Sequence, residues 1–347
     1  MKKRVLSVLL GVAMVSSLVV GCGSSSSDSS SDDAAAEETE ESGDGYKIIV
    51  VPKMTNLAWF ERMEYGVDQV KDAYAEKGIT VEYGGSAEGD GQAEYVEGLI
   101  GQGYDAICVV PFDVEALDPI LKKAQDEGIK VICHEASTVE NMDYDVEAFD
   151  TREYGAHLME KLAELTEGKG EYIQTVGALT SVSHVEEAEG GKTYADENCP
   201  DLKMATDLII SDDNADTAYS KVKEALTANP NINAIQCAAM SETPGAARAV
   251  KELGLSGKVH IAGTSLVSVC GEYVEDGTVE LMSFWDPALA GQAMIELAIA
   301  TLYGTAAEDI ALTTPGYEEL TLDGKVFTGS AWIDVDASNV NDEAYDF

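Results

Sequence analysis

The sequence contains few basic residues and lacks the common catalytic motifs. Lys and Arg together number 22 against 64 Asp and Glu, so the formal net charge is −42. A chain this acidic is a poor partner for phosphate backbones and anionic lipid surfaces, and we expect no nucleic-acid partner. The sequence has no GxSxG, Walker loop, HExxH or strand-linked GxGxxG pattern. We therefore expect neither enzymatic activity nor catalytic residues.

Cysteine is also scarce, and its spacing excludes the usual metal sites. None of the six cysteines forms a CxxC pair or a Cys/His cluster, so we expect no zinc, no other metal and no cofactor. Cys108, Cys133 and Cys237 lie in apolar runs, where cysteine is usually a small core residue. Five cysteines remain beyond Cys22, an odd number. We expect buried free thiols, with one disulfide left open.

The N-terminus has the pattern of an export signal. Three basic residues precede an apolar run over 5–20, which ends in "VVGC" and is short for a membrane-spanning helix. The small residues before Cys22 resemble a bacterial lipobox. Residues 1–21 are therefore predicted to be a lipoprotein signal peptide, with a lipid on Cys22 holding an extracytoplasmic protein to the membrane. The alternative is an ordinary secretory signal followed by an unrelated cysteine.

A low-complexity acidic segment separates Cys22 from the folded part of the chain. Residues 23–45 contain no aromatic residue and no Leu, Ile or Val, so they cannot bury enough apolar surface to fold. We interpret 22–45 as the acylated cysteine and a disordered acidic linker. The remaining 300 or so residues are enough for two domains.

Strand-like and helix-like segments alternate from residue 46 onwards. Buried strands are predicted at "YKIIVVP", "YDAICVVP" and "IKVICHEA", and amphipathic helices lie between them. The alternation restarts after about residue 150, with one continuous strand predicted over 202–211. Continuous apolar strands separated by helices indicate parallel sheets covered on both faces. The predicted fold class is α/β, with two doubly wound parallel-sheet domains and a ligand cleft at the carboxyl ends of their strands.

Four stretches resemble the sugar-binding proteins of bacterial ABC importers, which have the type I periplasmic-binding-protein fold: "VPKMTNLAWF", "GYDAICVVPFDVEAL", "VICHEAS" and "TVELMSFWDPALAG". The likeness is greatest to the autoinducer-2-binding and rhamnose-binding branch. It implies a three-crossing hinge near residues 150, 286 and 318. It also implies an N-terminal lobe of 46–149 and 286–317, and a C-terminal lobe of 150–285 and 318–347.

Several residues of the first half follow predicted strands and are candidate ligand contacts. Lys53 could donate to hydroxyl or carbonyl oxygens, and the resemblance implies a binding lysine there. Trp59 and Phe60 could stack on the apolar face of a sugar, or could simply be a core pair. Glu135 replaces the aspartate usual in the family and could accept hydrogen bonds from two hydroxyls.

The second half supplies five further candidates. The resemblance places His184 where relatives carry arginine or aspartate, and Met240 where the autoinducer-2 branch has alanine; Met240 could instead be core packing. It also places Ser265 after a strand that ends in the cleft. Trp285 and Asp286 lie at a predicted crossing, where an indole and a carboxylate suit a polyol, although Asp286 could serve only the hinge.

These features predict a monomeric solute-binding component of an ABC importer. It would capture a monosaccharide or small polyol by hinge closure and dock on a permease that works with an ATPase. The alternatives are an autoinducer-2-binding protein for uptake or signalling, and a sensor that presents its ligand to a membrane receptor. The export signal and the absence of a basic helix-turn-helix argue against a cytosolic repressor.

Overall fold

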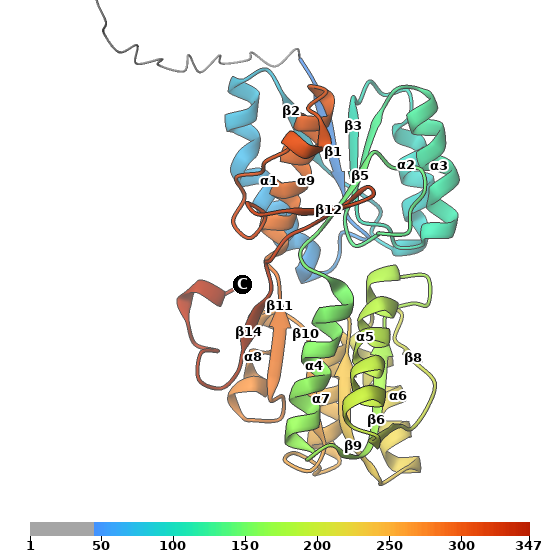
Figure 1. Cartoon of the computed structure of the whole chain (residues 1–347), viewed down its shortest axis with the longest axis vertical. Helices are drawn as coiled ribbons and strands as arrows, with labels where there is room; N and C mark the ends of the chain where they lie inside the picture. The colour runs from blue at the N-terminus through green and yellow to red at the C-terminus, as the bar shows by residue number, and fades with distance from the viewer. Residues whose placement is uncertain (1–44) are drawn as a thin grey trace, which may run out of the picture. The chain divides into compact units, whose positions relative to one another are not determined.

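The computed structural model describes residues 45–347, which contain two large sheets (Figure 1). The predicted signal peptide, the lipid-attachment residue Cys22 and nearly all of the acidic linker lie outside the described residues. Within 45–347, no helix combines the length and apolarity needed to span a membrane. The five cysteines of this range are free thiols, as expected, and all but Cys199 are buried.

The first sheet has the strand order β12-β13-β5-β4-β3-β1-β2 and is parallel except at the β12–β13 pair. Its strands are β1 (Lys47–Val51), β2 (Thr80–Tyr83), β3 (Ala106–Val109), β4 (Lys130–Cys133), β5 (Tyr144–Glu147), β12 (Thr321–Asp323) and β13 (Val326–Thr328). Helices α1 (Ala58–Glu76) and α9 (Pro287–Leu302) cover one face, and α2 (Gln92–Leu99) and α3 (Val114–Asp126) cover the other. We call this sheet and its helices the first lobe.

The alternation of side chains along β1 shows why the strand sequence is apolar throughout. Ile48 and Val50 belong to the hydrophobic cluster that includes α1 and α9, whereas Ile49 and Val51 belong to the cluster formed with α2 and α3. Successive side chains of a strand point to opposite faces, so a sheet with helices on both faces needs apolar residues at every position.

The second sheet has the order β14-β11-β10-β9-β6-β7, with β8 also paired to β6, and only β14 runs antiparallel. Its strands are β6 (Lys169–Val176), β7 (Asp201–Met204), β8 (Ile209–Ile210), β9 (Ile232–Cys237), β10 (His260–Thr264), β11 (Leu281–Phe284) and β14 (Ile333–Val335). Its helices are α4 (Thr151–Leu165), α5 (Val182–Asn198), α6 (Ala215–Ala228), α7 (Glu242–Glu252) and α8 (Val267–Glu275). These elements form the second lobe, and the α/β class with two parallel-sheet domains is confirmed.

The chain passes between the lobes three times: after β5, after β11 and after β13. The assignment of 318–347 to the second lobe is wrong in its first part, because β13 pairs with β5 of the first sheet and β12 pairs with β13. The third crossing therefore lies between Thr328 and Ile333 and not near 318. The single strand predicted over 202–211 is also wrong, since β7 and β8 pair with different parts of β6.

Candidate functional site

A cavity lies where loops from the carboxyl ends of strands in both lobes meet. It is lined by Lys53, Leu57, Trp59, Phe60, Glu135, His184, Asp213, Ala238, Ala239, Met240, Ser241, Thr264 and Trp285. The empty space is about 390 Å³ including the mouth, but only about 40 Å³ of it admits the centre of a water molecule. The cavity is thus a narrow cleft lined by aromatic side chains and a few polar groups, a composition typical of small-molecule sites.

A buried ion pair forms one wall of this cavity. Lys53 follows β1, and its Nζ donates to Oε2 of Glu135 at 2.6 Å. Lys53 is 4 % exposed and Glu135 is 5 % exposed. Lys53 Nζ also donates to the hydroxyl of Ser181 in the second lobe at 3.3 Å, so this ammonium joins the two lobes directly.

Gln92 of α2 fixes the loop that carries Lys53. Its amide nitrogen donates to the carbonyls of Pro52 and Val110, each at 2.7 Å, and its amide oxygen accepts from the Phe112 backbone. These three bonds tie the loop after β1 to the loop after β3. A buried side-chain amide with its hydrogen bonds satisfied holds both loops rigidly at the edge of the cavity.

Glu135 has a conformation that marks a special site. Its φ is +58°, a left-handed value that costs a residue other than glycine some free energy and is often found at binding sites. Burial is the largest influence and would raise the pKa of Glu135, but the charge and hydrogen bond of Lys53, together with His134 and His184, outweigh it, and the net pKa lies below the usual value. Oε2 also accepts from Ser183. Oε1 makes no hydrogen bond with any described residue, which leaves it free to accept from a ligand.

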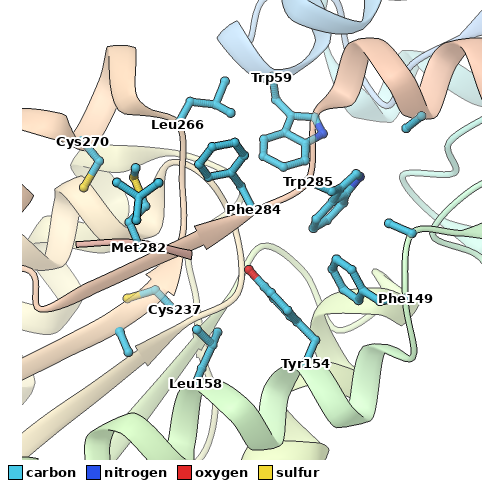
Figure 2. Close-up of a cluster of buried hydrophobic side chains, with 14 of the residues drawn as sticks. Trp59, Phe149, Tyr154, Leu158, Cys237, Leu266, Cys270, Met282, Phe284 and Trp285 are labelled. Atoms are coloured by element: carbon cyan, nitrogen blue, oxygen red, sulfur yellow. The ribbon is translucent and has the colours of Figure 1, made fainter. Parts of the chain in front are cut away.

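Aromatic rings form a further part of the cavity lining. Figure 2 shows Trp285 lying between Trp59 of α1 and Phe149 at the first lobe crossing. The ring centroids of Trp59 and Trp285 are 4.6 Å apart in an edge-on arrangement, and those of Phe149 and Trp285 are 5.1 Å apart. Trp285 Nε1 donates to Nε2 of His134, whose Nδ1 contacts the carbonyl of Val146. His134 therefore orients the Trp285 indole and does not face the cavity.

His184 and Asp213 bring polar groups from the second lobe. The Gly177 backbone N–H donates to Nδ1 of His184, so this nitrogen is an acceptor and the proton of the neutral ring is on Nε2. Burial, reinforced by Lys53, lowers the pKa of His184 to about 4. The imidazole is therefore uncharged at neutral pH and can serve as a hydrogen-bond donor to a ligand.

Two further carboxyl groups, those of Glu147 and Glu187, line a small second cavity that shares Glu135, His184, Ala238 and Trp285 with the first. Burial, followed by repulsion from Glu242, holds the pKa of Glu187 well above its usual range. Burial, followed by repulsion from Asp145, also holds the pKa of Glu147 well above its usual range. Because both groups favour the protonated form, they add little negative charge to the back of the cleft.

The structure brings together seven of the nine residues that the sequence suggested as ligand contacts. Ser265 and Asp286 are absent from the lining. Ser265 is fully buried and donates to the carbonyl of Met240. Asp286 caps the first turn of α9 and accepts two hydrogen bonds from Arg62. The polar groups of both side chains therefore make hydrogen bonds within the protein and do not face the cavity.

Sequence reasoning did not choose six of the lining residues: Leu57, Asp213, Ala238, Ala239, Ser241 and Thr264. Thr264 could have been found, since it ends β10 directly before the Ser265 that was chosen. Asp213 carries a weaker signal, because it follows the two-residue strand β8. Within residues 45–347, no group of three or more His, Cys, Asp or Glu side chains is arranged to hold a metal ion.

A comparison with protein families finds one match over most of the chain. The profile of a family described as periplasmic binding protein domain matches residues 48–306. Among curated proteins, the D-xylose-binding periplasmic protein of Escherichia coli K12 is 25 % identical over 257 residues, which cover 72 % of this chain and 75 % of the relative. The D-ribose/D-allose-binding protein of Pseudomonas aeruginosa is 26 % identical over 284 residues, which cover 77 % and 86 %.

Solved structures share the fold. A solute-binding protein of an ABC transporter from Clostridium phytofermentas with bound L-rhamnose superposes with a TM-score of 0.79 at 22 % identity, covering 87 % of this chain and 99 % of that one. LsrB from Clostridium saccharobutylicum in complex with AI-2 gives a TM-score of 0.75 at 22 % identity, covering 87 % and 100 %. At this level of identity the likeness concerns the arrangement of helices and strands.

Proposed function

Because this chain belongs to the periplasmic binding protein family, we propose that it is the extracytoplasmic solute-binding component of an ABC importer for a monosaccharide or small polyol. The observation that carries the proposal is the cavity between the lobes, which is lined by both the Lys53–Glu135 pair and the Trp59 and Trp285 rings. Aromatic faces suit the C–H surfaces of a sugar, while an ammonium and a carboxylate suit its hydroxyls. The D-xylose-binding and D-ribose/D-allose-binding relatives support the same ligand class.

The narrowness of the cavity implies that the lobes separate before a ligand enters. The three chain crossings provide a hinge, and the contact of Lys53 with Ser181 can open and re-form. A ligand that contacts both lobes binds the closed arrangement better and shifts the population toward it. The closed form is what a permease, working with its ATPase, would recognise. In the same proposal the protein acts as a monomer tethered by a lipid on Cys22, which mass spectrometry of the mature N-terminus would test.

Isothermal titration of the purified chain tests the ligand class. The panel comprises D-xylose, D-ribose, D-allose, L-rhamnose, D-galactose, xylitol and autoinducer-2. We expect at least one neutral sugar or polyol to bind at micromolar concentration or tighter, roughly −8 kcal/mol or more favourable. Binding of autoinducer-2 alone would replace the sugar assignment with a signalling one, and no heat with any compound would refute the proposal.

A further inference from the structure

Asp213 presents an unpaired carboxylate to the cavity. It is 9 % exposed, lines the cavity, and makes no hydrogen bond or ion pair with any residue in 45–347. A buried carboxylate without a donor loses much of its solvation, which costs free energy unless a partner arrives. Every other charged group of this lining already has a partner, since Lys53 and Glu135 neutralise each other.

The loop around Asp213 is built to hold the carboxylate in this place. Asp212 and Asp213 both have left-handed backbone conformations, with φ of +58° and +51°. The side chain of Asp213 packs against Gly177, where a Cβ atom would collide with the carboxylate oxygens. Gly177 also donates its N–H to His184, so the glycine, the imidazole and the carboxylate form one polar corner of the cavity.

The charges of the cavity lining can be counted from these contacts. Lys53 is the only Lys or Arg in the lining formed by the described residues, and Glu135 balances it. His184 adds no charge to the lining, because Nδ1 of its buried ring accepts a hydrogen bond from the N–H of Gly177 and so carries no proton. Asp213 therefore leaves the closed cavity with a net negative charge of one.

We propose that Asp213 determines which sugars the site accepts, by binding hydroxyl or ammonium donors of the ligand and repelling carboxylates and phosphates. The preferred ligands are then neutral polyols and amine-bearing sugars, while sugar acids are excluded. This inference rests on the proposed function, because it assigns a ligand class to the same cavity. It narrows that class by charge.

The test compares matched ligands on the full chain and on Asp213→Asn, by isothermal titration. The probes are D-xylose, D-ribose, L-rhamnose and D-galactose, the acids D-xylonate, D-ribonate, L-rhamnonate and D-galacturonate, and the amine D-galactosamine. In the wild type we expect each acid to bind about 100-fold more weakly than the best neutral sugar or amine. Asp213→Asn should weaken the best ligand about 10- to 100-fold, the range of a buried charged hydrogen bond. The loss should be larger for an amine than for its neutral parent.

The neighbouring Asp212 supplies a matched control, since it has the same chemistry and a similar backbone conformation but an exposed side chain. Asp212→Asn should leave every affinity unchanged. Asparagine tolerates the left-handed region, so both variants should fold, which a thermal melt would check. The inference is overturned by an acid that binds as tightly as its parent sugar, or by an Asp213→Asn variant with wild-type affinities. If wild type binds nothing in the panel, the proposed function falls and the inference falls with it.

Discussion

Each lobe buries a glutamate in the connection that follows a strand, Glu135 after β4 and Glu242 at the first residue of α7, and the two lobes stabilise it in opposite ways. In the first lobe, Glu135 is paired with the ammonium of Lys53, and its pKa is lowered. In the second, Glu242 accepts from the hydroxyls of Thr175 and Ser211 and from the backbone N–H groups of Ala238 and Ala239, without a cation. Burial raises its pKa to about 7. The ammonium of Lys53 keeps Glu135 ionised beside the cavity. Glu242 has only uncharged donors, and its raised pKa leaves a large part of it protonated at neutral pH.

The difference separates a group suited to ligand binding from a structural one. Glu135 retains a free oxygen in the cavity, where an ionised acceptor forms strong hydrogen bonds with hydroxyls. Glu242 is fully buried and holds the β9–α7 turn together. The stabilisation by the Lys53–Glu135 pair should therefore be lost as the pH falls and Glu135 is protonated. The stabilisation by the buried, protonated Glu242 should be lost as the pH rises through about 7.

Removal of the Lys53 ammonium is expected to have the largest effect on the free energy of unfolding. Lys53→Met leaves Glu135 buried without its counter-ion, which should reduce the free energy of unfolding by about 3–5 kcal/mol. Urea denaturation measures this loss, and titration with the bound sugar should show that affinity is lost as well.

The double variant Lys53→Met/Glu135→Gln should recover much of the stability but not the binding. Lys122→Met breaks an exposed pair with Asp126 and provides the control, with an expected loss of about 0–1 kcal/mol. A Lys53→Met loss no larger than this control would show that the buried pair contributes little.

The second largest effect is the change of stability with pH that comes from the titration of Glu242. Its pKa is higher in the folded state than the value of 4.5 it has as a free side chain, so the folded protein binds a proton more tightly. The corresponding stability is fully present below about pH 4.5 and is lost as the pH rises through about 7. The total is on the order of a few kcal/mol. Glu242→Gln should remove this dependence.

Urea denaturation between pH 5 and 9 measures this pH dependence. The quantity to follow is the difference in the free energy of unfolding between wild type and Glu242→Gln. The difference should move in favour of the variant as the pH rises. Of the other buried carboxyls with raised pKa values, Asp145 and Glu147 are present in both proteins and largely cancel. Glu187 does not cancel, because the variant also removes the repulsion from Glu242 that raises its pKa, and this moves the difference in the same direction. A difference that stays constant across this range would contradict the assignment.

The smallest effect concerns an ion pair that water can reach. Arg62 donates to both oxygens of Asp286, but the two side chains are 23 % and 12 % exposed. Arg62→Met should reduce the free energy of unfolding by about 1 kcal/mol, since solvent screens the pair. Denaturation at low and high salt measures it, and sugar affinity should stay at the wild-type value. A loss equal to that of Lys53→Met would show that burial is not what distinguishes the two pairs.

Much of the fold was predictable because the central strands of the first sheet, β1, β3 and β4, are apolar at almost every position. The sequence missed β5, since Asp145 and Glu147 interrupt its apolar pattern with carboxyl groups that only the tertiary structure accommodates. It also misplaced the third crossing. The strands β12 and β13 have three residues each, β12 is exposed throughout, and nothing local shows that β13 pairs with β5 and not with the second sheet.

The site was predictable where a residue directly follows a strong strand. Lys53 and Glu135 both do so, and their sequence positions led to the same edge of one sheet. Asp213 could not be found in this way, because its direction depends on a left-handed backbone and on the missing side chain of Gly177. Asp286 has the residue type of a ligand contact, but its partner Arg62 is more than 200 positions away.

The three crossings have a consequence for the order in which the molecule can assemble. The first lobe takes α9, β12 and β13 from residues 287–328, which are synthesised after most of the second lobe. Its sheet therefore cannot be completed until Thr328 has been made, although its first strand begins at Lys47. Most of the second lobe is available earlier and lacks only β14. Such long-range pairing slows folding. Neither sheet of the nascent chain can therefore be complete before Thr328, for the first lobe, or Val335, for the second, has been added.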